Sequence, residues 1–205
     1  MRSNVSKWER RFRNREYPTD PEPSAVLRRY LPSCPDGRAL DVATGTGRNA
    51  VFLAERGYEV DAIDQSRAGL EIARETATDR GVERRIEWIQ ADLSRHVFPP
   101  STYDLVTISF YRPVDRLPDI KATLRDGGVL FVQHHLRSSK PTESGSSDDR
   151  YRFAANELLH AAIDLTVLYY AERGGVRDDG RRSATVELLA RNSSGTNQTY
   201  PLIEE

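Results

Sequence analysis

Apolar positions along the chain follow two alternating rhythms. Short continuous apolar runs alternate with longer segments in which apolar residues recur every three or four positions. The short runs predict buried strands, and the longer segments predict amphipathic helices. This order is typical of a parallel sheet covered by helices on both faces. The expected strands are residues 38–43, 58–64, 85–92, 103–110 and 127–136, and the expected helices between them are residues 48–57, 66–81 and 115–124.

The two ends of the chain depart from this order. The pattern there predicts two N-terminal helices, then a polar mobile loop or lid, a further helix and a hairpin-like pair of strands. These segments are, in that order, residues 5–17, 23–31, 138–150, 153–162, 164–173 and 181–192. We therefore expect an α/β sheet with an antiparallel pair of strands at its C-terminal edge.

Composition narrows the function classes. The 205 residues suffice for one domain with a substantial core, and a formal net charge of -1 makes nucleic acid an unlikely partner. The single cysteine, Cys34, excludes a disulfide within the chain and a cysteine metal cluster. No apolar stretch approaches the length of a membrane span, and residues 1–11 lack the apolar region of a signal peptide. We expect a cytoplasmic protein with no membrane partner.

A glycine turn follows the first expected strand. In DVATGTGRNA, residues 41–50, the residues Gly45, Gly47 and Ala50 satisfy G-x-G-x-x-A, a pattern of dinucleotide-binding proteins. Asp64 ends the next strand, where an acid can accept hydrogen bonds from a ribose. These residues alone fit a nicotinamide oxidoreductase as well as any other nucleoside-binding protein.

Two further acids favour a ligand without phosphate. Asp41 lies four residues before Gly45, where its charge would repel a pyrophosphate but could hold an ammonium group directly or through water. S-adenosylmethionine carries such an ammonium and has no phosphate. Asp92, directly after the third strand, is placed to accept from an adenine amino group. We therefore expect S-adenosylmethionine rather than a dinucleotide.

Three segments, ALDVATGTGRNAVFLAERGYEVDAIDQS, QADL and DGGVLFV, resemble the class I S-adenosylmethionine-dependent methyltransferases over about residues 8–192. The first is most similar to the tellurite-resistance and thiopurine type of small-molecule methyltransferase. This resemblance implies a single Rossmann-like doubly wound domain, whose seven-stranded sheet is mostly parallel and has an antiparallel C-terminal strand. It also implies a small-molecule methyl acceptor, such as a thiol or a chalcogen oxyanion.

The resemblance divides the chain and assigns its cofactor site. Residues 1–34 are expected to form a helical cover, residues 35–192 the methyltransferase domain, and residues 193–205 a flexible tail. Ala43 departs from the family, which most often has glycine or another small residue there. The residues expected to bind the cofactor are Asp41, Ala43, Gly45, Gly47, Asn49, Asp64, Gln65, Asp92, Leu93 and Ser109.

Candidate acceptor residues end the fourth and fifth strands. His134 and His135 are the candidate catalytic bases, and neighbours on a strand face opposite sides, so at most one is expected to face the cleft. We favour His135. Adjacent histidines diverge and no third ligand is marked, so no metal site is expected. The candidate acceptor pocket contains Trp8, Tyr17, Phe110 and Tyr111.

Other functions remain open at this point. Methyltransferases that act on amino groups of nucleic acids commonly have a motif similar to Asn/Asp-Pro-Pro-Tyr after the fourth strand. The segment SFYRP, residues 109–113, lacks this motif. An RNA or protein methyltransferase that uses the arginine-rich first helix is therefore a weaker alternative. A module that binds S-adenosylmethionine without catalysis is another. The oligomeric state is not indicated.

Overall fold

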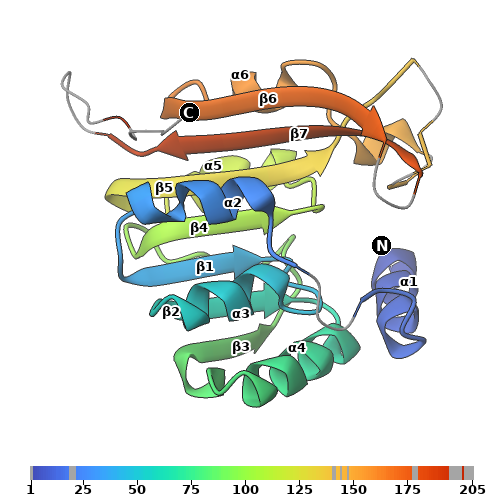
Figure 1. Cartoon of the computed structure of the whole chain (residues 1–205), viewed down its shortest axis with the longest axis vertical. Helices are drawn as coiled ribbons and strands as arrows, with labels where there is room; N and C mark the ends of the chain where they lie inside the picture. The colour runs from blue at the N-terminus through green and yellow to red at the C-terminus, as the bar shows by residue number, and fades with distance from the viewer. Residues whose placement is uncertain are drawn as a thin grey trace.

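Seven strands form one mixed sheet in the order β3-β2-β1-β4-β5-β7-β6 (Figure 1). The strands are β1 Arg38–Val42, β2 Glu59–Asp64, β3 Ile86–Gln90, β4 Tyr103–Ser109, β5 Leu124–His135, β6 Thr166–Val176 and β7 Arg182–Arg191. The first five pair in parallel, whereas β7 runs antiparallel to both β5 and β6. The expected fold class, a mostly parallel seven-stranded sheet with an antiparallel C-terminal strand, is confirmed.

Helices cover both faces of this sheet. They are α1 Arg2–Arg13, α2 Ala25–Tyr30, α3 Arg48–Glu55, α4 Arg67–Asp79, α5 Leu117–Lys121 and α6 Glu157–Ala161. Short 3-10 turns lie at Leu31–Ser33, Glu83–Arg85, Val114–Arg116 and Asp149–Tyr151. Successive strand residues alternate between two cores, so Leu105 packs on the side of α2 and α3 and Val106 on the side of α5 and α6.

The helix expected at residues 115–124 is shorter than the sequence pattern suggests. A 3-10 turn precedes α5, which ends at Lys121, and β5 already begins at Leu124. The backbone N–H groups of Thr102 and Tyr103 both donate to the carbonyl of Thr123, at 2.7 and 2.9 Å. Pairing with β4 therefore ends the helix early, and β5 begins three residues before Gly127, where the sequence pattern predicts its start.

The helix expected at residues 153–162 is likewise reduced, to the single turn of α6. Phe153 forms a bridge with Leu136 at the end of β5, and Asn156 has a φ of 60°, in the left-handed region. Both conformations are incompatible with helix, so tertiary pairing overrides the local periodicity. Ser66 caps α4 as its position suggests, because its Oγ accepts from the Gly69 N–H at 3.1 Å.

The structure, a computed structural model, describes residues 2–18, 22–139, 142–143, 145–146, 148–176, 180–193 and 200, and the side chains from residue 7 onward within these ranges. Most of the tail expected at residues 193–205 lies outside them, as do four residues of the loop expected at 138–150. Within the described ranges, no helix has the length and apolar character needed to cross a membrane.

Candidate functional site

The expected site lies where the strand order reverses. The chain moves from β1 to β2 and β3 in one direction across the sheet and then returns to β4 and β5 on the other side of β1. In open α/β sheets, ligands bind beyond the carboxyl ends of the strands at such a point. The glycine turn between β1 and α3, the end of β2 and the end of β4 all lie at this edge (Figure 1).

The turn between β1 and α3 needs residues that tolerate left-handed backbone. Ala43, Gly45 and Gly47 have φ angles of 59°, 58° and 83°. A Cβ atom on Gly47 would lie 2.7 Å from Cβ of Ala73, so this glycine also allows α4 to pack closely against the turn. Ala43 holds a conformation that glycine adopts without strain, which gives a physical reason for glycine being usual there.

The carboxylate of Asp64 lies directly beneath this turn. It accepts backbone N–H groups from Gly45 and Ser66, each at 2.8 Å, and the residue is only 6% exposed. Burial raises the pKa of Asp64 to about 6, although the two hydrogen bonds act against this shift. Asp64 thus joins the glycine turn to the start of α4, at the place where the sequence predicts ribose binding.

Asp41 lies deeper in the protein than the sequence suggests. Its two oxygens accept hydrogen bonds from the hydroxyls of Thr44 and Thr107, both at 2.6 Å. The residue is 2% exposed, and burial raises its pKa. In this structure Asp41 ties β1 to the turn and to β4, and the binding of an ammonium group by Asp41 stays a prediction.

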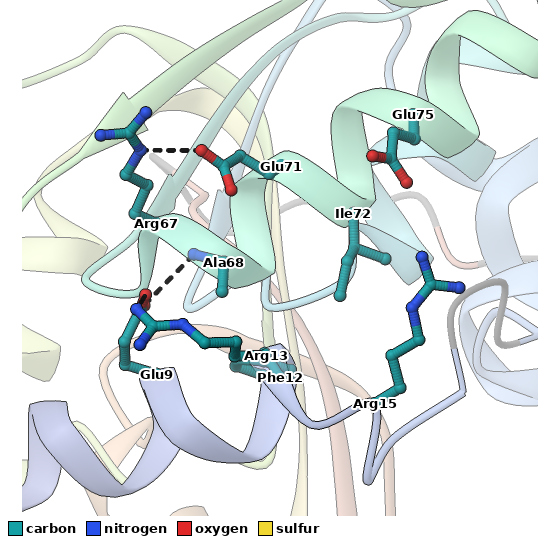
Figure 2. A pocket seen from close by; sticks show the side chains of 9 residues that line it. All are labelled: Glu9, Phe12, Arg13, Arg15, Arg67, Ala68, Glu71, Ile72 and Glu75. Carbon is teal, nitrogen blue, oxygen red and sulfur yellow. Dashed lines mark hydrogen bonds and ion pairs between the residues drawn. The ribbon is translucent and has the colours of Figure 1, made fainter.

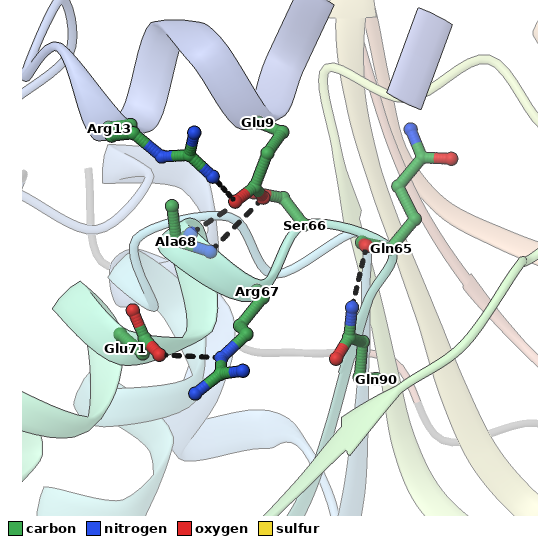
Figure 3. Close-up of polar contacts among 9 residues, drawn as sticks. Glu9, Arg13, Gln65, Ser66, Arg67, Ala68, Glu71 and Gln90 are labelled. Atoms are coloured by element: carbon green, nitrogen blue, oxygen red, sulfur yellow. Dashed lines mark hydrogen bonds and ion pairs between the residues drawn. The ribbon is translucent and has the colours of Figure 1, made fainter. Parts of the chain in front are cut away.

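Three of the residues expected to bind the cofactor follow β2 and β3. Asp92 is exposed, and its Oδ1 accepts from both N–H and Oγ of Ser94, at 3.0 and 2.7 Å, which lowers its pKa. Leu93 is buried in the core on the α5 and α6 face. Gln65 is partly exposed, and its carbonyl accepts from the side chain of Gln90 at 3.3 Å (Figure 3). The adenine role of Asp92 and the cofactor-binding roles of Leu93 and Gln65 stay predictions.

Asn49 joins the start of α3 to the end of β4. Its Nδ2 donates to Oγ of Ser109 at 3.0 Å, and the residue is 2% exposed. Its Oδ1 is buried and has no hydrogen-bond partner among the described residues. A buried acceptor without a partner is costly in the absence of a ligand. Asn49 therefore has an acceptor available for a donor at this edge of the sheet.

The two histidines at the end of β5 differ in exposure, but their ring centroids lie 5.8 Å apart and both rings lie near Phe110. The expectation that they face opposite sides of the sheet stays a prediction. His134 is 3% exposed and lies edge-on to Phe153, with ring centroids 5.3 Å apart. Burial lowers the pKa of His134 to about 4, and the neighbouring Arg112 and Arg152 act in the same direction. Its Nδ1 lies 3.2 Å from the backbone oxygen of His135. His134 is therefore neutral and a weak base near pH 7.

His135 is half-buried and lies beside the end of β4. Its ring centroid is 4.7 Å from that of Phe110, whose φ of 55° is unusual for a bulky residue. The guanidinium of Arg48 lies 5.1 Å from the Phe110 ring centroid and donates to Oε1 of Gln133 at 3.3 Å. The structure thus brings His135 and Phe110 together, and adds Arg48, which the sequence supports only weakly.

The remaining candidate pocket residues fall into two separate groups. One group consists of Trp8, Phe12 and Tyr17, whose ring centroids lie 5.5 to 5.8 Å apart. This group packs against the side chains of α4. Tyr111 is half-buried against the α5 and α6 core, and burial raises its pKa. Among the described residues, Tyr111 makes no ring contact with the N-terminal aromatic group. Sequence reasoning missed Glu9, Gly145 and Phe153, which contact the site residues across long sequence separations.

Within the described ranges, no cluster of three or more histidine, cysteine or acidic side chains is arranged to hold a metal ion.

Comparison with known proteins agrees with this geometry. Residues 39–128 match the family model of a methyltransferase domain. A ubiquinone/menaquinone biosynthesis C-methyltransferase, UbiE of Azotobacter vinelandii, is 34% identical over 137 residues, which are 62% of this chain and 53% of the relative. The chain thus spans about half the length of the curated relatives it matches.

Solved structures show the same fold. TehB from Haemophilus influenzae superposes with a TM-score of 0.71 at 21% identity, covering 83% of this chain and 62% of that one. An S-adenosylmethionine-dependent methyltransferase from Methanosarcina mazei superposes with a TM-score of 0.66 at 16% identity, covering 84% and 99%. The domain match and the curated relatives support an S-adenosylmethionine-dependent methyltransferase, and the solved structures show that the fold is shared.

Proposed function

We propose that this chain transfers the methyl group of S-adenosylmethionine to a small-molecule acceptor. The observation that carries the proposal is the position of Asp64. Its buried carboxylate lies at the carboxyl edge of the sheet, bonded to the glycine turn, inside the segment that matches the methyltransferase domain. An acid at this place accepts from ribose hydroxyls in nucleoside-binding sheets. In the proposal, the glycine turn faces the methionine part of the cofactor and Asp92 faces its adenine.

Methyl transfer requires little chemistry from the protein. The acceptor attacks the methyl carbon in line with the sulfonium, a bond to the acceptor forms as the carbon–sulfur bond breaks, and the thioether departs with the electron pair. The sulfonium is already a strong electrophile, so orientation supplies most of the rate enhancement. A thiolate or a chalcogen oxyanion needs no base.

A hydroxyl or an amine acceptor does need a base, and we assign this role to His135. His135 is half-buried and its ring lies 4.7 Å from that of Phe110, whereas His134 is 3% exposed and packs edge-on against Phe153. The low pKa of His134, about 4, also makes it a poor acceptor of a proton near pH 7. His135→Ala should lower turnover on such acceptors by about a hundredfold, which is the lower end of the usual contribution of a general base. Cofactor affinity should change little.

A quinol carbon is a second candidate acceptor, and one observation favours it. The curated relatives are named as ubiquinone/menaquinone biosynthesis C-methyltransferases, and the match to them covers 62% of this chain. A ring carbon becomes nucleophilic when a neighbouring phenolic oxygen loses its proton, so this acceptor would also depend on His135. Thiols and chalcogen oxyanions would not, which separates the two acceptor classes.

Calorimetric titration of the chain with S-adenosylmethionine, with NAD as the comparison ligand, tests the cofactor assignment. Asp64→Asn should weaken the binding of S-adenosylmethionine by about ten- to a hundredfold, the usual range for losing hydrogen bonds to a charged group. Asp61→Asn is the matched control. Asp61 is a buried acid on the same strand, and it binds Arg38 and Tyr103 instead of the turn. Binding of NAD alone would overturn the proposal.

Transfer itself is tested with methyl-labelled S-adenosylmethionine and separate pools of thiols, chalcogen oxyanions and quinols. Methyl label in one pool supports the proposal. The amount of label should fall in His135→Ala if the acceptor is a quinol, and should stay unchanged if it is a thiol or a chalcogen oxyanion. Tight cofactor binding without label in any pool of small acceptors would instead favour a binding module without catalysis.

A further inference from the structure

Helix α1 is fastened to the start of α4 by one carboxylate. Oε2 of Glu9 accepts a hydrogen bond from Oγ of Ser66 at 2.7 Å and from the backbone N–H of Ala68 at 3.2 Å (Figure 3). Its Oε1 accepts from Arg13, one turn along the same helix, at 2.9 Å. The first N–H groups of a helix have no partner within the helix, and they favour a negative charge. Glu9 therefore caps a helix that begins 58 residues after it.

The same serine also contacts the expected ribose-binding acid. The N–H of Ser66 donates to Oδ1 of Asp64 at 2.8 Å, while its hydroxyl accepts from Gly69 and donates to Glu9. Oδ2 of Asp64 accepts from the N–H of Gly45 at 2.8 Å. A continuous series of hydrogen bonds thus runs from α1 through Ser66 and Asp64 to the glycine turn.

Phe12 makes a second connection to the same turn. A Cβ atom on Gly45 would lie 3.3 Å from Cζ of Phe12, and one on Gly69 would lie 3.2 Å from its Cδ2. Phe12 is buried against Ala68 and Ile72, and Trp8 and Tyr17 pack around it. The ring of Phe12 therefore lies against Gly45, whose N–H donates to Asp64.

The remainder of the interface between α1 and α4 is open and charged. A groove of about 420 Å³ separates the two helices on their outer side (Figure 2). Arginines and glutamates from both helices line it, and they include Arg13, Arg67, Glu71 and Glu75. Arg67 is paired with Glu71 on its own helix, at 2.7 Å, and not with α1. Docking of α1 therefore depends on Glu9 and on the three aromatic residues.

We propose that Glu9 is a positioning residue that latches α1 onto the cofactor turn, so that docking of α1 and binding of S-adenosylmethionine stabilise each other. The inference rests on the proposed function, because it takes the turn and Asp64 as the cofactor site. Coupling of this kind is reciprocal: docked α1 strengthens cofactor binding by the same factor by which bound cofactor strengthens the docking of α1. The effect should appear as faster release of cofactor and a raised KM for it, with kcat unchanged.

Three variants test the latch. Glu9→Ala removes both hydrogen bonds to α4, and Glu9→Gln keeps an acceptor oxygen without the charge. Glu16→Ala is the matched control, because Glu16 pairs with Arg11 in the same N-terminal segment and has no hydrogen bond or ion pair with α4 among the described residues. Loss of a helix cap changes an equilibrium by about fivefold. Cofactor should therefore dissociate about fivefold faster from Glu9→Ala in stopped-flow displacement, less so from Glu9→Gln, and at the wild-type rate from Glu16→Ala.

A second readout reports docking without cofactor. In a Trp88→Phe background, Trp8 is the one tryptophan left in the chain. Its emission should shift to longer wavelength in Glu9→Ala and stay unchanged in Glu16→Ala, while added S-adenosylmethionine should partly reverse the shift. Unchanged dissociation in Glu9→Ala, or an unchanged Trp8 emission, would overturn the latch and leave the proposed function standing. Absence of S-adenosylmethionine binding to the wild type would overturn both, with the Trp8 shift still showing whether Glu9 docks the helix.

Discussion

Gly145 lies directly against the imidazole of His135. A Cβ atom on Gly145 would be 2.4 Å from Cδ2 of the ring and 2.7 Å from its Cγ. The glycine has a φ of 86°, so both its backbone and its lack of a side chain suit this contact. The polar segment that the sequence predicts as a loop or lid thus contributes a residue that covers the proposed base.

Gly145→Ala should displace this segment from His135. Gly180→Ala is the control, because Gly180 has a φ of 78° but no described atom within 4 Å of the added Cβ. Both variants should lose about 1–2 kcal/mol from left-handed strain. Only Gly145→Ala should shift the imidazole signals of His135 in NMR spectra of the four histidines. Equal shifts in both variants would contradict the contact.

Burial of neutral His134 predicts a pH-dependent stability. Its pKa is about 4 in the folded protein and about 6.5 when unfolded, so the unfolded chain binds more protons between these values. The contribution is complete above pH 6.5 and is lost as pH falls towards 4. The difference between the wild type and His134→Leu in free energy of unfolding should therefore rise with pH across this window, by up to about 1.4 kcal/mol per unit.

The comparison with His134→Leu is needed because Asp64 acts in the opposite direction. Its folded pKa, about 6, is raised, so its contribution is lost as pH increases from 3.8 through 6. Subtracting the curve of the variant cancels this second contribution. His160→Leu, at an exposed histidine, should leave the slope of the wild type intact. A difference curve that is flat for His134→Leu would show that His134 is not buried in its neutral form.

Cofactor affinity should depend on the charge of Asp64. Ribose hydroxyls donate to a carboxylate, so affinity for S-adenosylmethionine should be constant above pH 6 and fall by about tenfold per unit below it. Calorimetry across pH 5–8 measures this, and proton release on binding should be near zero at pH 8 and rise towards one proton as the pH falls below 6. In Asp64→Asn the weaker affinity should not vary over that range. A wild-type profile as flat as that of the variant would exclude Asp64 from the ribose.

The hydroxyl of Thr107 should matter for stability more than for cofactor binding. It is fully buried and donates to Asp41 at 2.6 Å, so Thr107→Val leaves a buried carboxylate with one donor fewer. We expect a loss of about 1.5–3 kcal/mol in the free energy of unfolding, as for other hydrogen bonds to charged groups. Affinity for S-adenosylmethionine should change less than about twofold if Asp41 is structural.

The control for that measurement is Thr102→Val. Its hydroxyl donates to the carbonyl of Pro100 at an exposed turn, at 2.9 Å, and its loss should cost less than about 0.5 kcal/mol. Weakening of cofactor binding in Thr107→Val alone, in proportion to the loss of stability, would show that Thr107 positions Asp41 for the ammonium group.

The fold and the place of the site follow from patterns within short stretches of sequence. Apolar runs predict buried strands such as Tyr103–Ser109. Periodicity and a serine cap predict α4, and two glycines predict the turn between β1 and α3. These signals are local because the helix repeat imposes a period on neighbouring residues, and burial on both faces of a parallel strand requires neighbouring residues to be apolar without a break. The glycine turn and Asp64 therefore stand at the same edge once the strands are parallel.

Tertiary structure alone decided which groups those residues meet. Both oxygens of Asp41 are taken up by Thr44 and Thr107, Glu9 reaches Ser66 across 57 residues, and Gly145 covers His135. The lengths of α5 and α6 were also set by pairing with β4 and β5 rather than by periodicity. Contacts of this kind join segments that are distant in the chain, and their formation depends on how helices dock on the finished sheet. No pattern of neighbouring residues carries that information.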